Sequence, residues 1–198
     1  MIIELAVSAA AVVVASAVAR AIVQRRAAQD AEREKRLAAA ARANDPRRGL
    51  RVGDVLLHVG DELWLAGMIE LDEEGTLLSI FRAPENTRTA WVAQLDDEAR
   101  ELALLSHSDE VPEGHVPDRL PLGGRVLSLL RRGSAKVRGH GEHLPPHGAK
   151  ARFTILHDAG GRVAMVIDFE GAPRLTLVGD RVERALIDVL PGGERGPE

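Results

Sequence analysis

The feature that most constrains the fold of this chain is an alternation of apolar and polar residues, interrupted at short intervals by turn residues. From Leu50 onward, Gly, Asp or Pro breaks the apolar runs about every 8–12 residues, a spacing typical of all-β domains. In the first half the pattern predicts strands at 53–59, 62–70, 76–82, 89–95 and 100–106. In the second half it predicts strands at 124–130, 134–140, 149–156, 162–169 and 173–178.

The two sets of strands resemble each other. Corresponding strands lie 71 to 73 residues apart, and at an offset of 73 the run 101–105 falls on 174–178. We therefore predict a tandem duplication of a five-stranded module, with halves at about 50–106 and 122–190 within a β domain at 49–192. Because such small modules bury little core, they should pack together as one barrel- or sandwich-like unit. Residues 107–121 would connect the halves, 185–190 would form a closing strand, and 193–198 would be a disordered tail.

The first 23 residues have a different character. They carry no charge between Leu5 and Ala19. As a helix rising about 1.5 Å per residue, residues 2–23 would reach about 33 Å, enough to cross a hydrocarbon core of about 30 Å. The cations follow this segment, whereas a secretory signal peptide carries them first. The sequence thus predicts an uncleaved transmembrane anchor at 1–23. A cleaved signal peptide and a soluble helix for self-association remain as alternatives.

Charge is distributed unevenly along the chain. Residues 24–48 carry a net charge of +4, and residues 49–198 carry −8. By the positive-inside rule, the Arg-rich flank stays in the cytoplasm, so we expect a single-pass membrane protein with a cytoplasmic β domain. Residues 24–43 are rich in helix formers and predict a charged helical spacer, which Asn44–Gly49 ends. An acidic, aromatic-poor domain is poorly suited to nucleic acid, and the absence of cysteine excludes disulfides and thiolate sites.

Few residues suggest chemistry. His140, His143 and His147 lie within eight residues and are weak candidates for a divalent metal site. A solvated hairpin loop is the simpler interpretation, because no fourth ligand is evident. The run 106–109 (SHSD) combines nucleophile, base and acid types, but a turn is expected there. Trp64 and Trp91 are expected in the core. We therefore predict no catalytic residue, no cofactor and no assigned metal ligand.

Several short motifs resemble a bacterial domain-of-unknown-function family, the one numbered 4178. They begin with LRVGDV at 50–55 and GDELWLAG at 60–67, continue with Trp91–Val92, and end with IDF at 167–169, Gly179 and an aliphatic run at 185–190. The resemblance covers about residues 50–192, although this chain has no tyrosine. It implies a protein linked to membranes and associated with membrane-stress proteins of the phage-shock type. It implies no catalytic residue.

Together, these features predict a membrane-anchored, non-enzymatic β domain that acts as a cytoplasmic binding or scaffold module with a protein partner. A periplasmic binding domain is the alternative, followed by a metal-binding or enzymatic protein that uses the loop of His140, His143 and His147.

Overall fold

The computed structural model of the chain describes Arg25, Gln29, Arg33 and residues 49–84, 89–95 and 101–192. The expected anchor at 1–23, the tail at 193–198 and nearly all of the spacer at 24–48 lie outside these residues. No helix among the described residues is long and apolar enough to cross a membrane.

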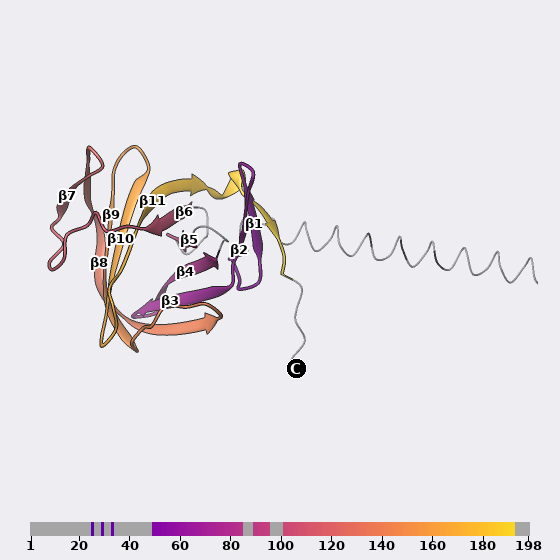
Figure 1. Cartoon of the computed structure of the whole chain (residues 1–198), viewed down its shortest axis with the longest axis horizontal. Coiled ribbons are helices and arrows are strands. Elements are labelled where there is room, and N and C mark those ends of the chain that lie inside the picture. Colours follow the sequence, from indigo (N-terminus) through magenta and orange to yellow (C-terminus); the bar gives the residue numbers. More distant parts are fainter. Residues whose placement is uncertain are drawn as a thin grey trace, which may run out of the picture. The chain divides into compact units, whose positions relative to one another are not determined.

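The β domain is a closed, all-β barrel of eight strands. Every neighbouring pair is antiparallel, the order is β3-β4-β5-β6-β11-β10-β9-β8, and pairing of β3 with β8 closes the ring (Figure 1). The strands are β3 (Gly67–Glu73), β4 (Thr76–Pro84), β5 (Thr89–Gln94), β6 (Glu101–His107), β8 (Arg125–Gly141), β9 (Lys150–His157), β10 (Arg162–Phe169) and β11 (Leu175–Glu183). The barrel therefore consists of two meanders, β3–β6 and β8–β11, joined along two seams.

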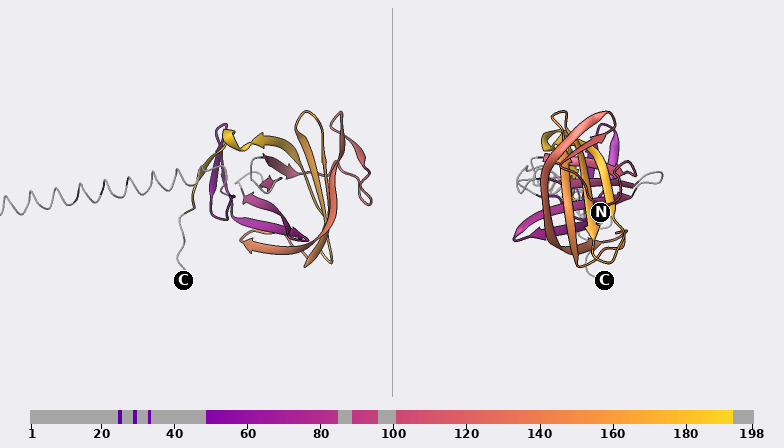
Figure 2. Two further views of the ribbon diagram at one scale, coloured as in Figure 1. Left: turned by 180° about the vertical axis from the view of Figure 1, so that it is seen from behind. Right: turned by 90° about the vertical axis from the view of Figure 1, so that its left-hand side faces the viewer.

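Two smaller units lie against the barrel. A three-stranded sheet in the order β12-β1-β2 contains β1 (Val55–His58), β2 (Asp61–Trp64) and β12 (Asp188–Leu190), and the 3₁₀ turn η1 (Arg184–Leu186) precedes β12. Strand β7 (Arg119–Leu122) forms a hairpin with the start of β8. Figures 1 and 2 show the three-stranded sheet and the β7 hairpin on opposite sides of the barrel.

Side chains of alternate residues fill the barrel interior. The inner positions of all eight strands form one apolar cluster, which includes Phe153, Met165 and Trp91. Trp91 is only 3% exposed, so its predicted core position is confirmed. Trp64 is 38% exposed, so its predicted core position is wrong. It lies on the face of β2 that points away from Leu63, which is buried against the barrel.

Each meander also carries an apolar cluster on its outer face. The three-stranded sheet covers the β3–β6 meander, burying Leu56, Phe81 and Val189 among others. On the β8–β11 meander, β7 and the connection that precedes it cover Leu127, Leu156 and Val166. Each meander of the barrel is therefore covered on its outer face, one by the three-stranded sheet and the other by β7 and the connection before it.

The structure corrects three predicted boundaries. The predicted strands at 124–130 and 134–140 are one continuous strand, Arg125–Gly141, because Gly133 does not end it but allows the Glu73 side chain to approach the backbone closely. Residues 62–70 are divided between β2 and β3. The predicted closing strand at 185–190 shortens to Asp188–Leu190, because η1 occupies its first residues.

Candidate functional site

A β-bulge in β8 decides which of its side chains face outward. Before the bulge, Leu127 belongs to the outer cluster, so odd-numbered residues face outward. The register then shifts between Leu129 and Arg131. After the shift, Ala135 and Val137 belong to the interior cluster, so even-numbered residues face outward. Because side chains alternate along a strand, one extra residue exchanges the two faces. The outward series is now Arg132, Ser134, Lys136, Arg138 and His140.

Two of these outward residues, Ser134 and Lys136, line an open groove with a volume of about 790 Å³. We call it the basic groove after its three cations, Lys136, Lys150 and Arg152. It crosses the outer face of β8, β9 and the end of β10. The turn between β3 and β4 borders one side, and Asp168 and Glu170 border the other. Its lining includes Ser134, Lys136, Lys150, Arg152, Phe169, Asp72, Glu74, Gly75, Asp168 and Glu170.

The cations on this face fall into two groups. Arg132, Arg138 and Arg174 are each paired: Arg132 with Asp118 at 3.0 Å, Arg138 with Glu70 at 3.2 Å, and Arg174 with Asp168 at 2.6 Å. Lys136, Lys150 and Arg152 line the groove, and we find no hydrogen bond or ion pair from their side chains to any part of the chain that the structure describes. In the described part of the chain these three exposed cations therefore form no ion pair, although the strand register sets Asp72 opposite Lys136 and Asp168 opposite Arg152.

The segment that connects β6 to β7 limits the groove at the end formed by Ser134, Arg152 and Asp168. Residues 108–118, which we call the strap, cross the outer face between β6 and β7. Arg174 donates to the carbonyl oxygens of Pro112 at 3.2 Å and Gly114 at 2.6 Å, and Arg132 donates to that of Val116 at 2.6 Å. A second space of about 450 Å³ lies between the strap and the sheet and shares Ser134, Arg152 and Asp168 with the groove. The two spaces are thus contiguous at Arg152.

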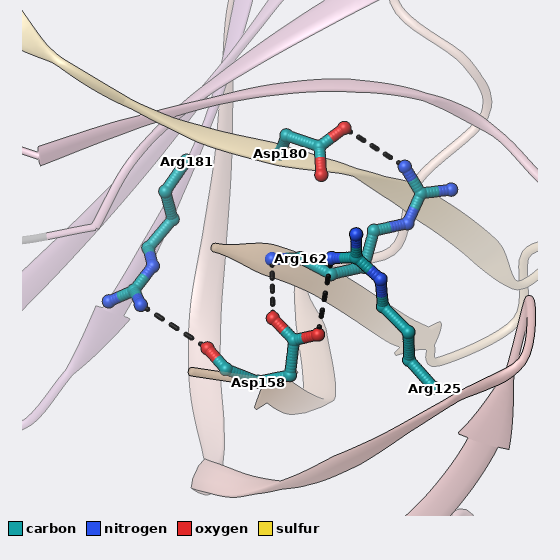
Figure 3. A network of polar contacts seen from close by, with 5 residues as sticks. All are labelled: Arg125, Asp158, Arg162, Asp180 and Arg181. Carbon is teal, nitrogen blue, oxygen red and sulfur yellow. Dashed lines mark hydrogen bonds and ion pairs between the residues drawn. The ribbon is translucent and has the colours of Figure 1, made fainter. Parts of the chain in front are cut away.

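A polar network at the β9–β10 turn holds the strands that carry the groove (Figure 3). Asp158 accepts from the Arg162 N–H at 2.8 Å and lies 3.3 Å from Arg125 Nη1, and Arg181 donates to its backbone carbonyl at 3.3 Å. Burial alone would raise the pKa of Asp158. The Arg162 N–H, the Arg125 charge and the Gly160 N–H outweigh that effect and hold the pKa below its usual value. Since Arg162 also pairs with Asp180 at 3.0 Å, this network fastens β9, β10 and β11 together.

The three histidines lie apart from the groove. His140 is on the outward face of β8, whereas His147 packs over Gly139, an inward position of the same strand. His147 Nδ1 lies 2.9 Å from the Pro145 carbonyl oxygen, and His143 Nε2 lies 3.9 Å from Glu142. Within the described ranges, no group of three His, Asp or Glu side chains is arranged to hold a metal ion.

The loop that carries these histidines differs from the predicted solvated hairpin. Leu144 packs against the interior cluster, and His147 is half-buried, with its ring 6.3 Å from that of Phe169. Leu144 and His147 occupy space that side chains at Gly67 and Gly139 would fill. The loop does join two antiparallel strands, and residues 141–143, 146 and 149 are exposed, but Leu144 and His147 are half-buried at one end of the barrel interior.

The SHSD run spans the end of β6 and the start of the strap: Ser106 and His107 are still in the strand, so the predicted turn begins only at Ser108. Ser106 Oγ donates to the Val178 carbonyl oxygen at 3.4 Å, and Ser108 Oγ accepts from the Glu110 N–H at 3.2 Å. His107 Nδ1 lies 3.7 Å from Asp109, and both side chains are exposed. Among the described residues, neither serine is hydrogen-bonded to His107, so this run has the hydrogen bonds of a turn.

Fold and site define a closed antiparallel β-barrel with a groove on its outer face, in which three cations lie between acidic borders. No protein-family model, no curated protein and no solved structure matches the chain. The resemblance to the family numbered 4178 stays a prediction.

The groove residues were missed in the sequence, although a signal for them exists. Arg132, Ser134, Lys136, Arg138 and His140 alternate with small or apolar residues, which is the pattern of a one-sided polar strand. The predicted strands end at residue 130 and resume at residue 134, and this break divides the series and hides its length and its charge.

Proposed function

We propose that this chain is a membrane-anchored, non-enzymatic binding or scaffold module whose β domain binds an anionic ligand in the basic groove. The observation that carries the proposal is that three exposed cations, Lys136, Lys150 and Arg152, line one groove and form no ion pair with the described part of the chain. Exposed charges with few competing contacts are free to pair with a charged partner, and such complementarity gives binding its specificity.

The acidic net charge of the β domain does not prevent an anion from binding in the groove. A net charge of −8 would repel an anionic partner at long range. At physiological salt the Debye length is about 8 Å, so local charges dominate within the groove. The β domain can thus be acidic as a whole and bind an anion at one place.

A photo-crosslinking amino acid tests whether this groove is a binding surface. We would introduce it at Ser134, inside the groove, and in a separate variant at Ser128, which is also exposed on β8 but lies outside the groove. In the native cell, irradiation should give a defined adduct at position 134 and none at 128. The same adducts at both positions, or none at 134, would contradict the proposal.

The cytoplasmic location is a separate part of the proposal. It is supported by the eight Lys and Arg residues of 24–48, which directly follow the apolar segment at 1–23. A phosphatase reporter fused after Glu198 should be inactive if the domain is cytoplasmic. An active reporter would favour the alternative, a binding domain on the periplasmic side, and would leave the groove proposal standing.

We also propose that the two meanders arose by tandem duplication. In support, three of the four strand pairs share nearly one spacing: β4 and β9 begin 74 residues apart, β5 and β10 begin 73 apart, and β6 and β11 begin 74 apart. The first pair, β3 and β8, begins 58 apart, because β8 starts earlier and is the longer strand. Each meander is, moreover, preceded by a strand or hairpin that covers its outer face. Superposition of β3–β6 on β8–β11 should align the four strands in order, with inward-facing residues on inward-facing residues. A superposition that exchanges the two faces of a strand would argue against duplication.

A further inference from the structure

The two lysines of the basic groove are direct neighbours across the β8–β9 pair. The register places Lys136 opposite Lys150, and it places Asp72 of β3 on the other side of Lys136. The Glu170 N–H donates to the Lys150 carbonyl oxygen, so Glu170 continues the row. The charges across four chain segments therefore follow the order negative, positive, positive, negative.

Lysine is used in an unusual way in this chain. It has only three lysines, Lys35, Lys136 and Lys150, so two of the three meet at this one place. Arginine or histidine supplies the cation in the ion pairs on the barrel and its loops, as at Arg132, Arg138 and Arg174. The compact ammonium of lysine has three rotatable donors and binds phosphate as a point charge. The pair is thus distinct in chemistry from the arginines that hold the fold.

The spacing of the groove cations suits one small oxyanion. Directly opposed residues have Cβ atoms about 5 Å apart, so both flexible lysine side chains can reach a single ligand. Arg152 lies two residues along β9 from Lys150, about 7 Å away on the same face. Ser134 is opposite Arg152 and adds a hydroxyl donor. The three cations and the hydroxyl are thus close enough on the two strands for their side chains to reach one oxyanion within the larger groove.

The acidic borders limit how far a ligand's negative charge can extend. Asp72 and Glu74 lie beyond Lys136, and Asp168 and Glu170 lie beyond Lys150 and Arg152. A polyanion crossing these strands would place further charges against the carboxylates, and like charges in contact are unfavourable. The geometry selects against an extended polyanion and in favour of a ligand with one compact charge.

We propose that the basic groove binds a single phosphate group, held by Lys136, Lys150 and Arg152, with Ser134 as an additional donor. This rests on the proposed function, since it names the ligand class of the same groove. The phosphate is either free, as in inorganic phosphate or a small monoester, or carried by a membrane lipid headgroup. The chemistry at the three cations is the same in both cases.

The scarcity of lysine provides a direct test. Reductive methylation with ¹³C-formaldehyde keeps the lysine charge and gives one NMR signal per lysine, with Lys35 as an internal reference. The full chain in a non-ionic detergent would be titrated with inorganic phosphate at constant ionic strength, with potassium chloride making up the difference. The signals of Lys136 and Lys150 should shift and saturate while that of Lys35 does not. Equal shifts of all three, or no shift of Lys136 and Lys150, would overturn the proposal.

Substitutions then test the contribution of each cation. Lys136→Gln and Lys150→Gln should each weaken phosphate binding at least about tenfold, because a charge-assisted contact is lost. Arg119→Gln is the matched control: Arg119 is an exposed cation of β7 outside the groove, and its loss changes the net charge equally. It should change the affinity less than twofold. Equal weakening by all three variants would mean a non-specific charge effect and would overturn the assignment.

A vesicle experiment distinguishes the two sources of phosphate. Full-length protein in nanodiscs of neutral lipid is compared with nanodiscs that contain phosphatidic acid, which exposes a phosphate monoester. A shift of the Lys136 and Lys150 signals by the lipid without added phosphate supports a headgroup, and a shift only on adding inorganic phosphate supports a free ligand. If the Ser134 adduct forms in cells but neither source shifts the signals, the groove binds a ligand of another class, so the phosphate proposal fails and the proposed function stands.

Discussion

The outer faces of the two meanders share an architecture but differ in how they are covered. On β3–β6 the three-stranded sheet buries Phe81, Val92 and Leu102. On β8–β11 the strap and β7 bury Leu156, Ala164 and Val166. They leave exposed the second half of β8 and the start of β9, where the groove lies. Apolar outward residues require a cover, whereas Lys136, Lys150 and Arg152 do not. The difference separates a face that stabilises the barrel from a face that is free to bind.

The largest expected effect is on the covered face. Phe81 is fully buried between β4 and the three-stranded sheet. Phe81→Ala should lower the free energy of unfolding by about 3–5 kcal/mol, because it removes a large buried ring and leaves a cavity. Urea denaturation measures this loss. Phe81→Leu, which fills more of the same space, should cost clearly less, and a loss below about 1 kcal/mol for Phe81→Ala would show that this face is not the stabilising one.

A smaller effect is expected at the boundary between cover and groove. The side chain of Arg174 is 23% exposed, pairs with Asp168 and holds the strap through two carbonyl oxygens. Arg174→Ala should lower the free energy of unfolding by about 1–2 kcal/mol, since these hydrogen bonds are lost. It should also increase cleavage of the strap by a Glu-specific protease at Glu110 or Glu113. Arg119→Ala is the control and should alter neither; unchanged cleavage in Arg174→Ala would contradict this role of Arg174.

The polar network around Asp158 at the β9–β10 turn should make the free energy of unfolding depend on pH. The pKa of Asp158 lies below its unfolded value of about 3.9. The ionised carboxylate therefore stabilises the fold above that pH, and this contribution is lost as the pH falls through the native pKa.

Asp158→Asn should consequently be less stable than the native chain at pH 7, and the difference should narrow below about pH 4. Urea unfolding at several pH values from 7 to 3 measures it. Asp109→Asn, at a carboxylate whose side chain is 97% exposed, is the control and should show little effect. A difference for Asp158→Asn that is constant across this pH range would argue against the linkage.

The smallest effect on stability is expected in the groove itself. Lys136 lies between a like charge, Lys150, and an acid, Asp72, so its loss should change the free energy of unfolding by no more than about 0.5 kcal/mol. Thermal unfolding of Lys136→Gln should therefore match that of the native chain. A loss above about 1 kcal/mol would mean that Lys136 stabilises the fold and would remove the contrast between the two faces.

Much of the fold could be predicted from the local pattern. Strands at 76–82, 89–95 and 162–169 were placed within a few residues of β4, β5 and β10, because alternation and turn residues are local signals. The predicted break between the strands at 124–130 and 134–140 is wrong, because Gly133 lies within β8 and allows close approach of Glu73. The core position predicted for Trp64 is also wrong, because an apolar residue in an alternating strand does not reveal which face of the strand is covered.

The sequence by itself determined an all-β domain, its turns, and the absence of thiol chemistry. Only the tertiary structure decided that the strands close into one barrel, because pairing of β3 with β8 and of β6 with β11 joins residues about 70 positions apart. The tertiary structure also determined which side chains line the groove. The bulge at Leu129–Arg131 reverses the alternation, and the β8–β9 register sets Lys136 against Lys150. Register depends on contacts between distant strands, and no local run of residues contains that information.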